Sequence, residues 1–258
     1  MFNSAEHYDR HVGRYNAELA RALISFAGVR PGQRVLDVGC GPGALTRELV
    51  AVVGADHVAA VDPSHSFAEA CRARLPGVDV RIASAEELPF ANATFDHALA
   101  QLVVNFMAGA KDGVTEMRRV TRPGGRVSAA TWDYASEMTF LRRFWDAAIA
   151  TDAQAAAVDE AVTMRYCNPD ELRDLLASTG LVDIAISSAV PHAAYANFDD
   201  LWEPITGGIG PSGVYVRSLD EQAQGVLKDA YRAILGVGDA PFELTARAWL
   251  ACGVVPSA

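Results

Sequence analysis

The stretch Val35-Leu36-Asp37-Val38-Gly39-Cys40-Gly41-Pro42-Gly43 is the part of this chain that decides its fold. Its first four residues are mostly apolar and β-prone, and they predict a short buried strand. The three glycines allow the backbone to turn sharply and let a ligand approach the main chain. The helix that we expect from about Ala44 directs its free N–H groups toward the same space. The stretch therefore predicts a strand, a ligand-binding loop and a helix.

Further strands and helices alternate after this loop. The expected strands cover residues 57–61, 78–82, 96–103 and 126–132, and the expected helices include one that Ser64 can cap and that runs to Leu75, and one that ends at Val120. A turn at Arg122-Pro123-Gly124-Gly125 precedes the last of these strands. Such alternation is typical of a parallel sheet with helices on both of its faces.

The two ends of the chain have a different pattern. Helical spacing of apolar residues predicts an amphipathic helix or helix pair over residues 6–27, and helices near 169–178 and 220–235. Two runs alternate apolar and polar residues, as edge strands do: Val182, Ile184, Ile186, and Phe242, Leu244, Ala246, Ala248. Residues 201–216 are rich in Gly and Pro and are interpreted as an irregular lid or cap.

These elements are assigned to a single domain over residues 1–258. We place its core at about residues 30–135 and 168–258, and a helical cap at residues 1–28, 133–166 and 201–236. The chain has 258 residues, half of them apolar, which is enough to bury a full core.

Composition excludes several classes of partner. The formal net charge of −10 argues against a surface that tracks nucleic-acid phosphates. No segment has the length and apolar character of a membrane span, and no targeting segment begins the chain, so we expect no membrane contact and a cytoplasmic location. The four cysteines are far apart in the sequence and predict neither a zinc site nor disulfides. Composition does not choose between a monomer and a homodimer.

Two cofactors fit the glycine loop at first sight. Residues 39–44 satisfy the dinucleotide pattern G-x-G-x-x-G/A, so NAD is one candidate. Asp37 favours another, since a carboxylate at the strand end repels a pyrophosphate and attracts an amino-acid ammonium, as in S-adenosylmethionine. Asp62 ends the second strand and can accept hydrogen bonds from ribose hydroxyls of either cofactor, or cap the next helix, although Ser64 is available for that role.

From Val35 to Trp132 the chain resembles the class I S-adenosylmethionine-dependent methyltransferases, close to the ubiquinone and menaquinone biosynthesis (methyltransferase type 11) branch. The resemblance rests on five motifs in register, namely the glycine loop, Val61-Asp62-Pro63-Ser64, residues 84–90, Phe95-Asp96 and residues 122–125. It implies an α/β fold with a Rossmann-like, seven-stranded, mostly parallel sheet, one antiparallel edge strand, helices on both faces and a helical cap.

The resemblance also implies roles for individual residues. The glycine loop would hold the methionine moiety, Asp62 the ribose, Pro63 and Phe67 the adenine face, and Gln101 the sulfonium end, while the N-terminal helix with Tyr15 closes over the cofactor. The candidate cofactor residues are Tyr15, Asp37, Gly39, Cys40, Gly41, Gly43, Asp62, Pro63, Phe67, Ser84, Ala85, Glu86 and Gln101.

Some of these residues have a second interpretation. Phe67 is as well placed to pack in the core beside its helix as to pack against adenine. Cys40 is interpreted equally well as a small side chain that fills space inside the loop. Ser84 stands where the family commonly has an Asp that accepts from the adenine amino group. A neutral acceptor should bind more weakly, so Ser84→Asp is predicted to keep or tighten cofactor binding. His97 lies in an apolar strand and is expected to be a hydrogen-bonded core residue.

Methyl transfer from a sulfonium is an in-line displacement from an activated donor, so alignment and exclusion of water are the main requirements. No acid–base pair is obligatory, and we assign no catalytic residue and no metal. The aromatic and apolar cap predicts a small organic acceptor. Two alternatives remain at this point, an NAD-dependent oxidoreductase and a non-catalytic S-adenosylmethionine-binding protein.

Overall fold

A computed structural model of the chain describes residues 12–208 and 210–257. The first part of the expected N-terminal helix and cap, residues 1–11, therefore lies outside the described residues. The chain divides into two compact units. The sheet unit consists of the described parts of Asn16–Trp132, Arg165–Ala189 and Ala248–Ala258, and the helical unit of the described parts of Met1–Tyr15, Asp133–Met164 and Val190–Arg247.

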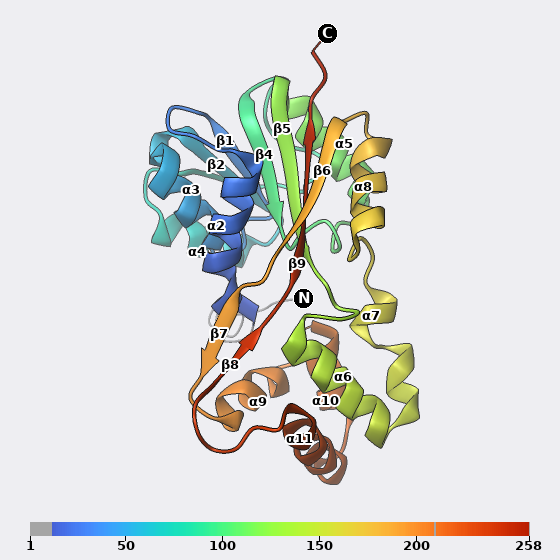
Figure 1. Cartoon of the computed structure of the whole chain (residues 1–258). Helices are drawn as coiled ribbons and strands as arrows, with labels where there is room; N and C mark the ends of the chain where they lie inside the picture. The colour runs from blue at the N-terminus through green and yellow to red at the C-terminus, as the bar shows by residue number, and fades with distance from the viewer. Residues whose placement is uncertain (1–11, 209, 258) are drawn as a thin grey trace. The chain divides into compact units, whose positions relative to one another are not determined.

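The sheet unit contains a seven-stranded sheet (Figure 1). Its strands are β1 (Val35–Val38), β2 (Val58–Asp62), β3 (Asp79–Ile82), β4 (Phe95–Gln101), β5 (Thr121–Trp132), β6 (Val182–Ala189) and β9 (Ala248–Val254). Their order across the sheet is β3-β2-β1-β4-β5-β9-β6. Only β9 runs antiparallel to its neighbours β5 and β6. The Rossmann-like, mostly parallel sheet is confirmed, and its one antiparallel strand lies a single place in from the edge strand β6.

Helices cover the two faces of this sheet (Figure 1). They are α2 (Asn16–Ala27), α3 (Ala44–Val53), the short η2 (Ala55–His57), α4 (His65–Arg74), α5 (Ala110–Val120) and α8 (Pro169–Ser178). Alternate residues of each strand point to opposite faces. Leu36 and Val38 of β1 share a core with α5 and α8, and Ala60 of β2 packs with Cys71 of α4 in a second core. The side chain of Asp37 therefore points to the α3 and α4 face.

The parallel register brings the carboxyl ends of three strands together. Asp37 of β1 pairs with Ala60 of β2 and with Leu99 of β4. Asp62 and Gln101, which end β2 and β4, are therefore each two residues beyond a partner of Asp37. Because the side-chain period of a strand is two, Asp37, Asp62 and Gln101 all point to the same face of the sheet.

The helical unit has an aromatic core. Its elements are η1 (Val12–Tyr15), α6 (Thr139–Thr151), η3 (Ala153–Ala157), α7 (Glu160–Thr163), β7 (His192–Tyr195), α9 (Phe198–Thr206), α10 (Gly210–Ser218), α11 (Glu221–Leu235) and β8 (Phe242–Thr245). Phe144 of α6 contacts the rings of Trp145 and Tyr231 edge-on at centroid distances of 5.1 and 5.7 Å. Ring pairs of this kind add stability beyond the area that they bury.

The prediction that residues 201–216 are irregular was wrong. This region forms the end of α9 and most of α10. The side-chain oxygen of Asn197 accepts from the Asp200 N–H at 3.0 Å and caps α9, whose buried residues Phe198, Leu201, Trp202 and Ile205 follow helical spacing. The Gly and Pro residues concealed this pattern. Gly213 is required in α10 because a Cβ there would lie 2.7 Å from the Gly208 backbone.

The alternating run from Phe242 to Ala248 is not one strand. Its first part, β8, pairs with β7 in a separate two-stranded sheet, and Ala248 begins β9 in the large sheet. Between them Arg247 forms an ion pair with Asp133 at 2.6 Å. A period of two indicates one buried face in both strands and carries no information about which strand is the partner. The run Val182 to Ile186 does lie in the edge strand β6.

The two units also differ in extent from the core and cap expected from sequence. Residues 16–27, expected in the cap, belong to the sheet unit, and residues 190–200 and 237–247, expected in the core, belong to the helical unit.

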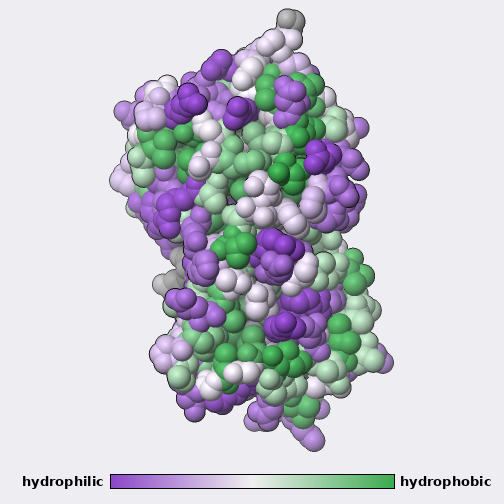
Figure 2. All heavy atoms as spheres, viewed as in Figure 1, coloured by the Kyte–Doolittle hydropathy of each residue, from purple (hydrophilic) through white to green (hydrophobic). Residues whose placement is uncertain are grey.

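Hydrophilic and hydrophobic residues are interspersed on the face of the molecule that Figure 2 shows. Among the residues that the structure describes, no helix has both the length and the apolar character needed to span a membrane.

Candidate functional site

The glycine loop after β1 has a backbone that only glycine adopts readily. Gly39, Gly41 and Gly43 have φ angles of 73°, 53° and 97°. A Cβ on Gly39 would lie 2.5 Å from Cγ2 of Val103, whereas a Cβ on Gly41 would meet nothing within 4 Å. Gly39 is thus needed for packing of the loop against the segment after β4, and Gly41 borders open space where a ligand can approach the main chain.

Most backbone N–H groups of the loop have partners, and the next helix supplies the free ones. Gly39 and Cys40 donate to the Val61 carbonyl at 2.8 and 2.9 Å, and Gly43 donates to the Cys40 carbonyl at 3.0 Å. Helix α3 begins after Gly43, and no side chain of the described residues caps it. Its first N–H groups can therefore donate hydrogen bonds to an anionic group such as a carboxylate, and its dipole favours the negative charge there.

Asp37 is a buried carboxyl group with one oxygen unpaired. It is 1% exposed, and Thr46 in the first turn of α3 donates its hydroxyl to Oδ2 at 2.6 Å. Oδ1 is buried and has no hydrogen-bond partner among the described residues. Burial raises the pKa of Asp37 to about 7, although the Thr46 hydrogen bond opposes this rise. A buried carboxyl oxygen without a donor is unfavourable unless a ligand supplies one.

Gln101 provides a second unpaired acceptor on the neighbouring strand. It is 8% exposed, and its Nε2 donates to the Asn16 carbonyl at 3.3 Å at the start of α2. That bond fixes the orientation of the amide, and its Oε1 is buried without a partner among the described residues. The ends of β1 and β4 therefore present two acceptors with no donor, a combination suited to a ligand that carries N–H groups or a positive charge.

Asp62, at the end of β2, is hydrogen-bonded through both of its oxygens. The Gly41 N–H donates to Oδ2 and the Ser64 N–H to Oδ1, each at 2.8 Å. Burial raises its pKa, although these two bonds oppose the rise. Each carboxylate oxygen can accept a further bond, so two hydroxyl donors can still bind. Asp62 does not cap α4, because Ser64 accepts from the Phe67 N–H at 3.4 Å, as expected from sequence.

Ser84, Ala85 and Glu86 lie in the loop after β3. Ser84 is exposed and donates its hydroxyl to the Glu86 carboxylate, which also accepts from the Gly109 N–H at 3.0 Å. Partial burial alone would raise the pKa of Glu86, but these hydrogen bonds hold it below its usual value. Glu86 therefore supplies a negative charge two residues after Ser84. Ala85 is buried in the core that includes α5.

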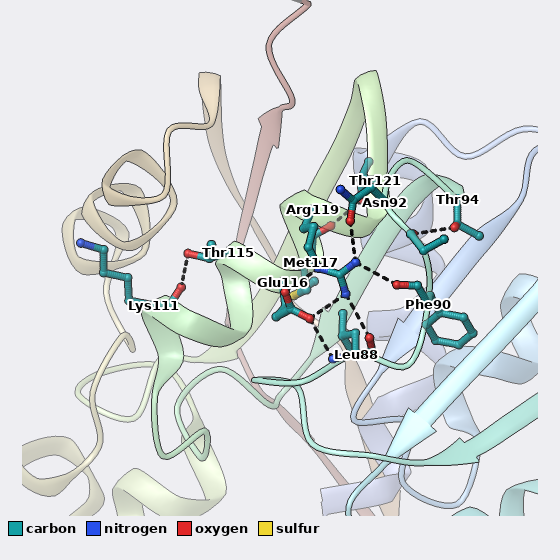
Figure 3. A network of polar contacts seen from close by, with 11 residues as sticks. Leu88, Phe90, Asn92, Thr94, Lys111, Thr115, Glu116, Met117, Arg119 and Thr121 are labelled. Carbon is teal, nitrogen blue, oxygen red and sulfur yellow. Dashed lines mark hydrogen bonds and ion pairs between the residues drawn. The ribbon is translucent and has the colours of Figure 1, made fainter.

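A network from α5 holds the segment that follows these three residues (Figure 3). Arg119 forms an ion pair with Glu116 at 2.6 Å and donates to the carbonyls of Leu88 and Phe90 at 3.0 and 2.8 Å. Glu116 in turn accepts from the Leu88 N–H at 2.9 Å. These bonds attach the loop after β3 to a helix, so Ser84 and Glu86 are carried by a well-anchored segment.

The remaining candidate residues have varied surroundings. Pro63 is exposed and Phe67 is half-buried, so Phe67 is not a core residue and presents part of its ring at the surface. Cys40 is buried, and its hydrogen bond with Cys71, together with burial, raises the pKa of the thiol, consistent with a filler. Tyr15 belongs to the helical unit, where its hydroxyl lies 3.1 Å from that of Tyr195. A contact of Tyr15 with a cofactor stays a prediction.

Sequence reasoning missed three residues of the site. Thr46 orients Asp37 through its hydroxyl. The sequence signal for Thr46 was a polar residue directly after Leu45, in the first turn of the expected helix. The Asn16 carbonyl holds Gln101, a backbone contact with no sequence signal. Leu102 has a φ of 61°, uncommon for a residue with a branched side chain, directly after Gln101. Such strain is found where a site requires a particular backbone path.

Comparison with known proteins agrees with this geometry. Residues 36–129 match the family model described as "Methyltransferase domain". Over these residues the chain is similar to a methyltransferase domain. The matched segment contains the glycine loop, Asp62, the loop after β3 and Gln101, so all of the candidate residues except Tyr15 lie within the domain.

Two curated relatives resemble this half of the chain. Malonyl-[acyl-carrier protein] O-methyltransferase of Erwinia billingiae is 34% identical over 128 residues, which are 50% of this chain and 50% of the relative. Demethylmenaquinone methyltransferase of Beutenbergia cavernae is 38% identical over 110 residues, 43% of this chain and 45% of the relative. The chain spans about half the length, or less, of the curated relatives it matches.

Solved structures resemble almost the whole chain in fold. One is phosphoethanolamine N-methyltransferase 2 of Haemonchus contortus in complex with S-adenosyl-L-methionine, with a TM-score of 0.58 and 16% identity. The match covers 93% of this chain and 53% of that one. At this identity the likeness shows a shared Rossmann-like fold.

Proposed function

We propose that the chain is an S-adenosylmethionine-dependent methyltransferase that acts on a small organic acceptor. The observation that carries the proposal is Asp37 Oδ1 at the end of β1, a buried carboxyl oxygen to which no described residue donates, beside a helix that no described side chain caps. The amino-acid end of this cofactor has an ammonium and a carboxylate. Asp37 matches the ammonium, and the N–H groups at the start of α3 match the carboxylate.

The other residues complete the site in this proposal. Asp62 accepts from the ribose hydroxyls, and Phe67 and Pro63 cover the adenine. Ser84 and Glu86 lie at the adenine edge, and the Gln101 amide oxygen lies toward the sulfonium. When bound, the cofactor supplies an activated methyl group, whose bond to sulfur breaks as an acceptor lone pair forms the new bond. The chain then has to align the acceptor and exclude water.

The acceptor itself is proposed only as a class. The names of the relatives point to an acyl-carrier-protein-bound malonyl group and to a quinone, and that of the structural neighbour to an amine. These acceptors differ in the attacking atom, so their names do not choose among O-, C- and N-methylation. A reducing compartment, the cytoplasm, is part of the proposal, and the four free, buried cysteines support it.

An NAD-dependent oxidoreductase is the alternative that shares the glycine loop. Asp37 weighs against it, because a pyrophosphate beside a buried carboxyl group would be repelled and would leave Oδ1 without a donor. Calorimetric titration of the purified chain with S-adenosylhomocysteine and with NAD separates the two. We expect saturable binding of S-adenosylhomocysteine and none of NAD, and the reverse result would overturn the proposal.

Methyl transfer needs a second measurement, since a cofactor-binding protein without activity would pass the first. We would follow formation of S-adenosylhomocysteine with carboxylates, phenols, quinols and amines as acceptors. Turnover with one of these classes above the rate without acceptor supports the proposal. Tight cofactor binding without turnover across acceptors of all four classes would support the non-catalytic alternative instead.

A further inference from the structure

A cavity of about 180 Å³ lies at the amino ends of the central strands, at the edge of the sheet opposite the glycine loop. Its polar lining comes from the loop after α2 and from the starts of β4 and β5. The residues that matter are Arg30, Gln33, Asp96, His97, Arg122 and Arg126. All of them belong to the sheet unit, and none has a role in the proposed cofactor site.

The cavity has more positive than negative charge. Of its charged residues, three are arginines and one is an acid, Asp96, in a chain whose formal net charge is −10. Both oxygens of Asp96 are already engaged, one by the Arg34 N–H at 2.7 Å and the other by Nε of Arg122 at 2.5 Å. Asp96 thus orients Arg122 and leaves the two Nη groups of that guanidinium for another acceptor.

The other two guanidinium groups also retain donors. Arg126 donates from Nη1 to the Ala27 carbonyl at 3.0 Å, which holds its side chain against the end of α2 and leaves Nη2 and Nε. The guanidinium of Arg30 makes no hydrogen bond or ion pair with the residues that the structure describes. Several cationic donors that face one cavity are the usual arrangement for binding a multivalent oxyanion.

His97 is a second, independent indication of a ligand. It lines the cavity, is 4% exposed, and its Nδ1 has no hydrogen-bond partner among the described residues. The expectation of a hydrogen-bonded core histidine was therefore wrong at this nitrogen. Burial lowers the pKa of His97 to about 4, with Asp96 opposing this and Arg126 and Arg122 adding to it. An anion in the cavity would offset the positive charge of both arginines. It would therefore favour the protonated form of the His97 ring.

We propose that this cavity binds a small oxyanion of the phosphate class, either free phosphate or the phosphate group of a small metabolite. Its volume accommodates one such group with a small substituent. Arg122 and Arg126 bind the oxyanion oxygens, and Arg30 adds charge from the loop after α2. Because His97 gains a proton more readily beside the anion, binding of an anion that keeps its charge strengthens as the pH falls.

The test is calorimetric titration with sodium sulfate and sodium phosphate, with sodium chloride at equal ionic strength as the reference. We expect saturable sulfate and phosphate binding that Arg122→Gln and Arg126→Gln each weaken about tenfold or more. The matched control is Arg143→Gln in the helical unit. Its side chain is 53% exposed, like that of Arg122, and is likewise paired with an aspartate. Unchanged S-adenosylhomocysteine binding shows that each variant is folded.

Two further measurements distinguish free phosphate from a phosphorylated metabolite as the natural ligand and test the role of His97. Phenyl phosphate should bind more tightly than phosphate if the natural ligand is a phosphorylated metabolite, and more weakly if it is the free ion. NMR titration of the histidine ring signals should show a higher pKa for His97 with sulfate than without it. The proposal is overturned if sulfate binding does not exceed that of chloride, if Arg143→Gln weakens it as much as Arg122→Gln, or if sulfate leaves the His97 pKa unchanged.

Discussion

Asp37 in the sheet unit and Glu160 in the helical unit are both buried carboxyl groups whose pKa burial raises to about 7. Their surroundings differ. Glu160 accepts from the indole N–H of Trp145 at 2.8 Å, beside an ion pair of Asp159 with Arg142 at 2.8 Å, and neither of its oxygens is buried without a partner. Asp37 accepts from Thr46 through one oxygen, and its other oxygen has no partner in the part of the chain that the structure describes.

The comparison shows that a raised pKa does not by itself identify a ligand site. Burial raises the pKa of both groups, and it does so whether or not a ligand is expected. The unpaired oxygen is the feature that distinguishes Asp37, because it requires a donor that none of residues 12–208 and 210–257 supplies. Glu160 is interpreted as part of the aromatic core of its unit.

The strongest prediction is that neutralising Asp37 weakens cofactor binding, whereas neutralising Glu160 does not. Asp37→Asn keeps the shape of the side chain and removes the charge that would face the ammonium. We expect it to weaken S-adenosylhomocysteine binding by at least about thirtyfold in calorimetry, as for a buried charge pair that loses one partner. Glu160→Gln is the matched control and should leave the affinity unchanged within about twofold. Equal losses in both variants would contradict the distinction drawn here.

The next effect is the pH dependence of stability. The folded protein holds a proton on Asp37 and Glu160 up to a pH of about 7, whereas the unfolded chain releases both near pH 4. The unfolded state therefore binds fewer protons in this window, and the free energy of unfolding falls as the pH rises from about 4 to 7. Urea unfolding should show a smaller fall in Asp37→Asn and in Glu160→Gln than in the parent chain.

A bound cofactor should change this pH dependence of the free energy of unfolding. A bound ammonium favours ionised Asp37, so saturating S-adenosylhomocysteine should remove the Asp37 part of the fall and leave the Glu160 part. The affinity for S-adenosylhomocysteine should likewise rise with pH through about 7, and it should stay level in Asp37→Asn. If the ligand removes the pH dependence equally in Asp37→Asn and in the parent chain, Asp37 does not face the ammonium.

A third comparison concerns one left-handed glycine from each unit. Gly39→Ala combines a positive φ with a Cβ 2.5 Å from Val103, and we expect a loss of about 2 to 4 kcal/mol in the free energy of unfolding, with loss of cofactor binding. Gly236 ends α11 with a φ of 66° and open space around it. Gly236→Ala should cost about 1 kcal/mol and leave cofactor binding intact. Thermal unfolding with and without S-adenosylhomocysteine measures both quantities.

The smallest effect concerns Glu86, a carboxylate whose pKa is lowered instead of raised. Sequence alone predicts that Ser84→Asp keeps or tightens cofactor binding. The structure adds that the new carboxylate would lie beside Glu86, which now accepts from the Ser84 hydroxyl. We therefore expect a loss of about two- to threefold from Ser84→Asp, since solvent screens exposed charges, and recovery in Ser84→Asp/Glu86→Gln. A large loss in both variants would show that Ser84 does not occupy the position at which the family has its Asp.

Much of the fold and site could be predicted because it depends on local patterns. The strand from Val35, its glycines and the helix from Ala44 follow from neighbours in the sequence, and the alternation of strands and helices implies parallel order. That order places Asp37, Asp62 and Gln101 at one edge of the sheet before any contact is known. The helices at residues 201–216 were missed for the opposite reason, because Pro204 and the glycines obscured a helical spacing that was present.

Local pattern is enough to predict that a glycine loop with an acid before it ends a buried strand, and therefore which cofactor chemistry suits the chain. The partners of each group become known from the folded chain alone. Thr46 donates to one oxygen of Asp37 and no other residue that the structure describes donates to the second, and Phe242 and Ala248 belong to different sheets despite one continuous pattern. The physical reason is that burial and alternation are properties of one segment, whereas hydrogen-bond partners and strand pairing depend on segments distant in the sequence.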